Sequence, residues 1–187
     1  MALTDGDRDV RPLTAEEVLR MVDAGILGED EPVELLQGVL TAVSPKSPAH
    51  GMVKTRLISW LAPVVVEGRC ALRVEEPLVV PDGTSLPEPD LAVVEGDIAT
   101  GHPHTALLVV EVAVTSRTVD LRVKPDLYAG AAPEYWVVDV TERCVEIFTS
   151  PRDGRYTHRG VARAGDQIIP VAVATPPLDV MALLAGV

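Results

Sequence analysis

The hydrophobic positions of this chain change between a helical and a strand-like period. Thr14 and Glu17 have the spacing of a capping box, which predicts a helix that ends before Gly25. Ser47 followed by Pro48 is typical of a second helix start, and the apolar residues after Pro48 recur at helical spacing. Two further helices are expected, at residues 120–131 and 178–184.

Strand-like runs occupy most of the remaining chain. Residues 33–43 predict a hairpin that turns at Gln37-Gly38. The run at residues 106–114, ALLVVEVAV, is the most strand-like and is expected at the centre of a sheet. Other strands are expected at residues 70–80, 90–95, 135–140, 145–148, 156–161 and 167–171. This order predicts an α/β (α+β) fold with a mixed central β-sheet flanked by helices, in one domain over residues 13–187 after a flexible leader at residues 1–12.

Composition narrows the range of functions. Aromatic residues make up 3% of the 187 residues, so Val, Leu, Ala and Ile are expected to fill the core. The formal net charge of -12 disfavours broad electrostatic capture of nucleic acid without a local basic patch or metal ions. The N-terminus is polar, and no apolar run approaches the roughly 18 to 20 residues that a membrane helix needs. We therefore expect a cytoplasmic protein.

One carboxylate interrupts the most strand-like run. Glu111 stands inside ALLVVEVAV, and an unpaired ion in a buried strand is costly. A basic side chain, backbone N–H donors or a cation must stabilise the ionised carboxylate, or a raised pKa must keep the carboxyl group neutral. The alternative to a functional site is a purely structural ion pair. Asp90 starts a short apolar strand after a proline-rich loop. Two carboxylates at neighbouring strand ends suit Mg²⁺, which keeps several waters and takes substrate phosphate for its remaining positions.

Four segments carry a resemblance to a known family. In chain order they are VELLQG, SPAHG, PEPDLAVV and LLVVEVAVTSRTVDLRVKPDLYAGAAPEYWVVD. Their order and spacing resemble the large bacterial family of restriction-endonuclease-like proteins in the PD-(D/E)XK nuclease superfamily, over roughly residues 13 to 148. The resemblance implies a restriction endonuclease-like core and a DNA endonuclease that depends on Mg²⁺ or Mn²⁺. It also implies a homodimer, since many nucleases of this superfamily act as pairs.

The same resemblance assigns the main site residues. Asp90 and Glu111 match the acidic positions, and the Val112 carbonyl is a further expected metal ligand. The lysine of the (D/E)-x-K tripeptide is missing, because Ala113 occupies its position. Similar families supply this lysine from the following helix, where Lys124 stands. Lys124 would then orient the attacking water or stabilise the charge of the transition state.

Four other residues are accessory candidates. Tyr128, four residues after Lys124, would share its helix face. Glu34 is either an acid that joins the metal shell through water or a surface residue of the hairpin. His50 is either an accessory acid, base or phosphate contact or a structural histidine, and Arg117 either contacts phosphate or caps its loop.

A rival interpretation belongs to another functional class. The acidic surface and the missing lysine at Ala113 are also compatible with a catalytically inactive nuclease-fold dimer that serves as a binding or interaction module. A response of protein stability to Mg²⁺ or Mn²⁺ separates the two interpretations. If Asp90 and Glu111 repel one another without a cation, removal of either is expected to stabilise the cation-free protein. No P-loop, GxSxG, GxGxxG or HExxH pattern supports another chemistry.

Overall fold

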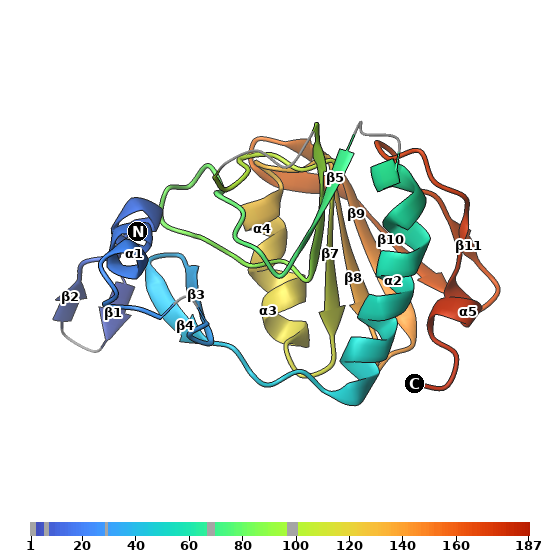
Figure 1. The fold of residues 1–187 in the computed structure, drawn as a ribbon, viewed down its shortest axis with the longest axis horizontal. Helices are drawn as coiled ribbons and strands as arrows, with labels where there is room; N and C mark the ends of the chain where they lie inside the picture. The colour runs from blue at the N-terminus through green and yellow to red at the C-terminus, as the bar shows by residue number, and fades with distance from the viewer. Residues whose placement is uncertain (1–2, 6–7, 29, 67–69, 97–100) are drawn as a thin grey trace.

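The computed structural model describes residues 3–5, 8–28, 30–66, 70–96 and 101–187. Its centre is a six-stranded mixed sheet with the strand order β10-β9-β8-β7-β6-β5 (Figure 1). The strands of this sheet are β5 (Cys70–Val74), β6 (Leu91–Glu95), β7 (Leu108–Ala113), β8 (Glu134–Asp139), β9 (Cys144–Arg152) and β10 (Arg155–Arg163). The helices are α1 (Ala15–Asp23), α2 (Pro48–Val66), α3 (Arg117–Arg122), α4 (Lys124–Tyr128) and α5 (Val180–Leu183). The expected fold class is therefore confirmed.

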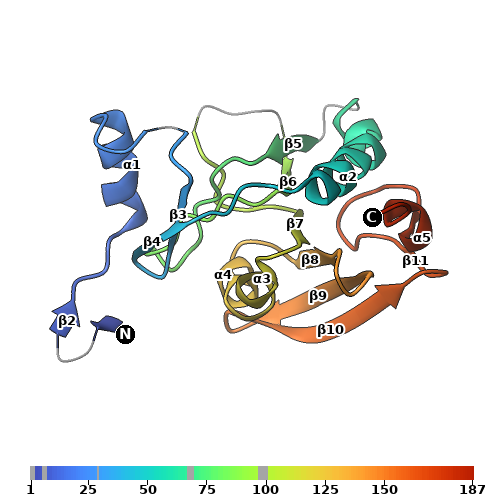
Figure 2. The same cartoon turned by 90° about the horizontal axis from the view of Figure 1, so that it is seen from below.

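The strands β7 and β8 run parallel, and α3 and α4 form the crossover between them. A parallel pair requires such a crossover, whereas β5, β6, β9 and β10 join their neighbours as antiparallel strands. The helix α2 covers one face of the sheet, and α3 with α4 covers the other (Figure 2). The crossover thus begins after Ala113, the last residue of β7 and two residues after Glu111.

Alternation along β7 separates two apolar cores. Val110 and Val112 pack in the core that contains α2, while Val109 and Ala113 pack in the core that contains α4. Side chains of a strand point alternately to its two faces, so Glu111 lies on the same face as Ala113, towards α3 and α4. A long side chain from α4 can therefore reach the carboxylate of Glu111.

Three two-stranded pairs lie outside the central sheet. They are β1 (Leu3–Asp5) with β2 (Arg8–Val10), β3 (Val33–Leu36) with β4 (Val39–Ala42), and β11 (Gln167–Ile168) with β12 (Leu178–Asp179). The β3–β4 hairpin turns at Gln37 and Gly38, as predicted. Both residues have a positive φ. A side chain at Gly38 would lie 2.2 Å from the Cβ of Pro12, so the turn needs glycine for space as well as for its backbone conformation.

The first helix and the segment before it were both predicted from the sequence. The capping box at Thr14 and Glu17 is present, and α1 ends just before Gly25, whose φ is +67°. The predicted leader includes residues 1–2 and 6–7, which lie outside the described residues, and the described residues beside them form β1 and β2. The flexibility of this leader and the single domain over residues 13–187 stay predictions.

Several predicted elements differ from the structure. The strand expected at residues 167–171 ends at Ile168, and the helix expected at residues 178–184 begins at Val180, after β12. The strand expected at residues 70–80 ends at Val74, because Glu75 adopts a φ of +51° and Pro77 follows it. The helix expected at residues 120–131 is instead the two short helices α3 and α4, which are separated at Val123. Pro125 accounts for this break, because a proline has no N–H to bond to the preceding turn. Within the described ranges, no helix is both long and apolar enough to cross a membrane.

Candidate functional site

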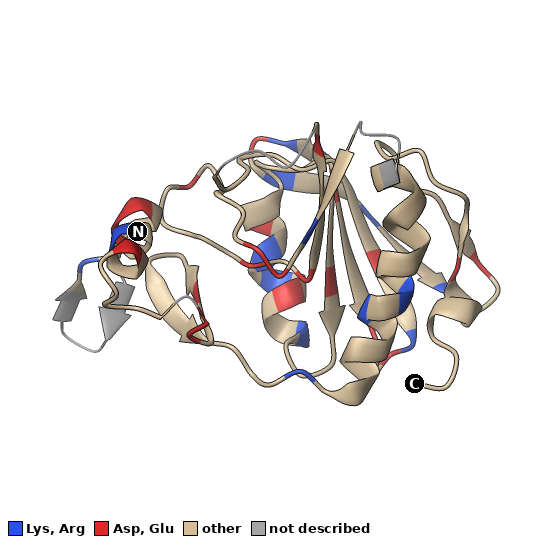
Figure 3. Ribbon diagram, viewed as in Figure 1, with Lys and Arg blue, Asp and Glu red and all other residues tan. Residues whose placement is uncertain are grey.

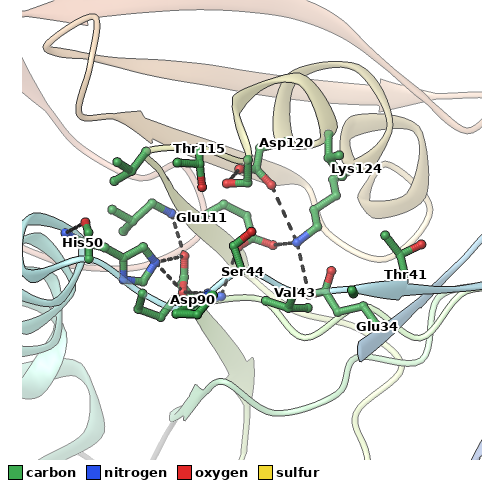
Figure 4. Close-up of a pocket in the computed structure, with 18 of the residues that line it drawn as sticks. Glu34, Thr41, Val43, Ser44, His50, Asp90, Glu111, Thr115, Asp120 and Lys124 are labelled. Carbon is green, nitrogen blue, oxygen red and sulfur yellow. Dashed lines mark hydrogen bonds and ion pairs between the residues drawn. The ribbon is translucent and has the colours of Figure 1, made fainter. Parts of the chain in front are cut away.

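A pocket of about 260 Å³ lies where the β3–β4 hairpin, the start of α2, the end of β7 and the α3–α4 crossover meet (Figure 4). Each of these segments contributes a polar side chain. Residues of both charge signs lie on α3 and α4 beside it (Figure 3). The titratable or basic residues that line the pocket are Glu34, Lys46, His50, Asp90, Glu111, Asp120 and Lys124.

Asp90 lies just before β6 and is 2% exposed. The N–H of Val112 donates to Asp90 Oδ2 over 2.8 Å, and the Nε2 atom of His50 lies 3.0 Å from the carboxylate. Lys46 Nζ donates to Asp90 Oδ1 over 3.1 Å. Burial alone would raise the pKa of Asp90, but the bond to His50, the charge of Lys46 and the Val112 N–H hold it well below its usual value. Asp90 is therefore an ionised carboxylate.

Glu111 is the other buried carboxylate of the pocket. Its Oε1 accepts hydrogen bonds from Lys124 Nζ over 2.7 Å and from the Tyr128 hydroxyl over 2.9 Å. Its Oε2 accepts a longer bond, 3.3 Å, from the N–H of Asp90. Burial raises the pKa of Glu111, the charge of Lys124 opposes this, and the nearby charge of Asp90 adds to it, so that together they bring the pKa to about 8. Glu111 is thus a carboxylate that gains from an additional positive charge.

Lys124 reaches into the pocket from the first residue of α4 and is 5% exposed. Besides Glu111, its Nζ atom lies 3.2 Å from Glu34 Oε1 and 3.7 Å from Asp120 Oδ1. Burial would lower the pKa of Lys124, but these carboxylates together hold it well above its usual value. The ammonium group stays charged and joins β3, β7 and α3 through ionic contacts.

The structure brings together most of the residues singled out from the sequence. Asp90, Glu111 and Lys124 lie in one pocket with Glu34 and His50, and the buried Tyr128 donates to Glu111 from behind. Arg117 does not line the pocket: its guanidinium, 48% exposed, pairs with Asp139 at the end of β8. Val112 lines the pocket, and the role of its carbonyl as a metal ligand stays a prediction.

Sequence analysis missed two charged residues that line the pocket, Lys46 and Asp120. Lys46 pairs with Asp90, and Asp120 lies beside Lys124 and accepts a hydrogen bond from Ser116. The chain has three lysines, so the position of Lys46 just before the helix-opening SPAHG segment was a usable signal. Asp120 offered no such signal, because an acidic residue in the first turn of a helix is common for reasons unrelated to a site.

The donor set of the pocket fits a hard divalent cation. Four carboxylates, those of Glu34, Asp90, Glu111 and Asp120, face the ammonium groups of Lys46 and Lys124, so negative charge is in excess. Among the described residues, no group of three or more His, Cys, Asp or Glu side chains forms a closed metal-ligand set. Mg²⁺ needs no such set, because one or two carboxylates suffice when waters and substrate phosphate complete its coordination. Asp90 and Glu111 are the two carboxylates at adjacent strand ends.

Two comparisons with known proteins found matches. The sequence profile of a family named Uma2 and described as "Putative restriction endonuclease" matches residues 15–179. A solved structure described as a "putative nuclease belonging to DUF820" from Anabaena variabilis superposes with a TM-score of 0.73 at 17% sequence identity. That similarity covers 93% of this chain and 98% of the other, so the two share a fold. No curated protein matches the sequence.

Proposed function

Because this chain belongs to the Uma2 family, described as "Putative restriction endonuclease", we propose that it is a metal-dependent DNA endonuclease of the PD-(D/E)XK type. The reaction is hydrolysis of a phosphodiester bond. One observation carries the proposal: Lys124 Nζ lies 2.7 Å from Glu111 although the lysine position of the tripeptide is Ala113. The chain has no lysine two residues after the acid, and the ammonium that contacts the acid belongs to a lysine 13 residues after it.

The contacts of the pocket support a division of roles. Asp90 and Glu111, with the Val112 carbonyl, would hold Mg²⁺ or Mn²⁺, which supplies a Lewis acid for the phosphate when bound. Lys124 keeps its proton and donates hydrogen bonds, so it can orient the attacking water or stabilise negative charge that develops on the phosphoryl oxygens. Its contact with Glu34 fixes the direction of its side chain.

Two neighbours serve as positioning residues. The Tyr128 hydroxyl donates to the same Glu111 oxygen as Lys124, which leaves Glu111 Oε2 on the side of Asp90. His50 fixes the Asp90 carboxylate from α2, and its Nδ1 atom is buried with no partner among the described residues. The contact of the His50 Nε2 atom with Asp90 supports an orienting role for His50 on this carboxylate. Arg117 stays outside this scheme because Asp139 holds it.

The test is nicking of a supercoiled plasmid in the presence of Mn²⁺. We expect cleavage by the wild type and loss of cleavage in Asp90→Asn, which is nearly isosteric. Asp139→Asn is the matched control, since Asp139 is also a buried aspartate at a strand end but pairs with Arg117 outside the pocket. A wild type that neither nicks DNA nor gains thermal stability from Mn²⁺ would favour the catalytically inactive binding module instead.

The proposal includes a homodimer, because a nuclease that cuts both strands of a duplex can place one active site on each strand. Light scattering at micromolar concentration should give twice the chain mass of 19.9 kDa. A monomer mass would exclude this part of the proposal and leave single-strand nicking as the expected reaction. The cytoplasmic location expected from the sequence stays a prediction.

A further inference from the structure

Lys46 differs from the other cationic side chains of the pocket in its access to solvent. It lies in the segment between β4 and α2, which forms one rim of the pocket, and its side chain is 41% exposed. The side chains of Lys124 and His50 are 6% and 5% exposed. Of the basic side chains that line the pocket, Lys46 is therefore the one that a molecule arriving from solvent can touch.

Lys46 is also held loosely. Among the described residues, its Nζ has one carboxylate partner, Asp90, at 3.1 Å, whereas Lys124 contacts three carboxylates. Because the Lys46 side chain is 41% exposed, water can solvate its ammonium when it leaves the pair, whereas the buried Asp90 then needs another positive charge beside it. Asp90 keeps its bonds to His50 and to the Val112 N–H when Lys46 moves away. The four-carbon side chain allows that movement without any change in the backbone.

The charges of the pocket indicate which group a displaced Lys46 ammonium would contact. A phosphodiester that enters meets four carboxylates and two ammonium groups, one of which is buried in contacts with three of those carboxylates. A divalent cation at Asp90 would repel the Lys46 ammonium and would itself balance the negative charge of the Asp90 carboxylate. The nearest alternative partner for a displaced ammonium at the rim is the anionic backbone of the substrate. The hydroxyl-bearing Ser44 and Thr115 also line the pocket (Figure 4).

We propose that Lys46 is a substrate-binding residue whose ammonium group contacts a phosphate of the DNA backbone when Asp90 holds a divalent cation. This inference rests on the proposed function. It assigns Lys46 to the substrate, and it assigns Lys124 to the carboxylates and the reacting phosphate. In this proposal the Lys46–Asp90 ion pair forms in the cation-free protein and separates when the cation binds.

Binding of a short DNA duplex tests the assignment without relying on cleavage. Affinity is measured by fluorescence anisotropy in Ca²⁺ at several salt concentrations, since each phosphate contact contributes about 0.9 to the slope of log affinity against log salt. We expect Lys46→Met to lower the affinity and to reduce this slope by about 0.9, and Lys46→Arg to restore most of it. Lys54→Met is the control: Lys54 is the other lysine of α2 and the segment before it, pairs with Glu75, and does not line the pocket.

A second measurement separates the inference from the proposed function. The increase in melting temperature with Mn²⁺ should persist in Lys46→Met, because Asp90 and Glu111 are unchanged. An unchanged salt slope in Lys46→Met, with a wild type that binds both Mn²⁺ and DNA, would overturn the inference and leave the proposed function intact. Equal losses of slope in Lys46→Met and Lys54→Met would also overturn it, by indicating a general charge effect. A wild type that binds neither Mn²⁺ nor DNA would overturn both.

Discussion

Glu111 and Glu134 are both buried carboxylates, on the neighbouring parallel strands β7 and β8, but their surroundings differ in kind. Glu111 is 3% exposed and Glu134 is 1% exposed. Glu134 accepts hydrogen bonds from two uncharged donors, the Trp136 indole over 2.7 Å and the N–H of Val171 over 2.6 Å. Glu111 instead contacts the ammonium of Lys124 and lies close to other carboxylates.

The difference separates a structural carboxylate from a candidate catalytic one. Two neutral N–H donors fill the two oxygens of Glu134 and tie the C-terminal segment at Val171 to the sheet. Such a carboxylate needs no ligand. The pocket around Glu111 has more carboxylates than ammonium groups, and this excess is relieved only by protons or by a cation. Burial alone therefore does not mark a site, whereas unbalanced buried charge does.

The largest effect is expected when Lys124 is replaced by methionine. Lys124→Met keeps the buried side-chain stem but leaves three carboxylates without their common partner, so we expect a loss of about 3–5 kcal/mol in unfolding free energy without metal. Plasmid nicking should disappear. Lys54→Met, a control at a partly exposed ion pair, should cost less than about 1 kcal/mol in the same urea titrations. If Lys124→Met also cost less than about 1 kcal/mol of unfolding free energy, the carboxylates around Lys124 would not depend on its charge. The charge of the pocket would then be as well balanced as that around Glu134.

The two acidic site residues should respond in opposite directions in the cation-free protein. The pKa of Asp90 is lowered, so its ionised form stabilises the fold, and Asp90→Asn should cost about 1–3 kcal/mol in EDTA at neutral pH. The pKa of Glu111 is raised to about 8, so its ionised form is unfavourable, and Glu111→Gln should be neutral or stabilising. This corrects the expectation that removal of either carboxylate stabilises the protein, because Asp90 has partners of its own in Lys46 and His50.

Thermal melts with and without Mn²⁺ extend the comparison of these two variants. Both should lose the stabilisation by Mn²⁺ that the wild type gains, because both lack a proposed ligand. A full Mn²⁺ response in either variant would remove that residue from the ligand set. If Asp90→Asn proves more stable than Glu111→Gln in EDTA, the described charge balance of the pocket is wrong.

Local sequence patterns predicted much of the fold. The capping box at Thr14 and Glu17 and the turn at Gln37-Gly38 depend on neighbouring residues, and both are present. The predicted strand at residues 70–80 was too long, because apolar residues continue past Val74 while the backbone turns at Glu75. Hydropathy reports burial, and residues 78 and 80 are buried without being part of a strand.

The site could be predicted only in part, for a related reason. Glu111 and Glu134 both interrupt apolar runs, so hydrophobic patterning alone cannot tell the two apart. Order and spacing of the PEPD and VEVA segments singled out Asp90 and Glu111, and the helix after β7 pointed to Lys124. Lys46 reaches Asp90 across 44 residues of sequence, and no local pattern encodes that contact.

The smallest effect is expected at Glu134, and its sign sharpens the contrast with Glu111. Burial raises the pKa of Glu134 above its ordinary value of 4.5, although the Val171 and Trp136 N–H groups oppose this. A carboxyl group with a raised pKa holds its proton more tightly when folded, so its contribution to stability is complete below about pH 4.5 and is lost as the pH rises through the folded-state pKa. Glu134→Gln does not titrate, and its amide nitrogen faces one of the two N–H donors, so we expect a cost of about 1 kcal/mol at acidic pH. That cost should shrink between about pH 4.5 and pH 7, because only the wild type loses stability there.

Urea titrations of the wild type, Glu134→Gln and the exposed control Glu142→Gln across this range measure the difference. Parallel stability curves for the wild type and Glu134→Gln would show that Glu134 does not titrate with folding, and Mn²⁺ should stabilise both proteins equally because Glu134 takes no part in the pocket.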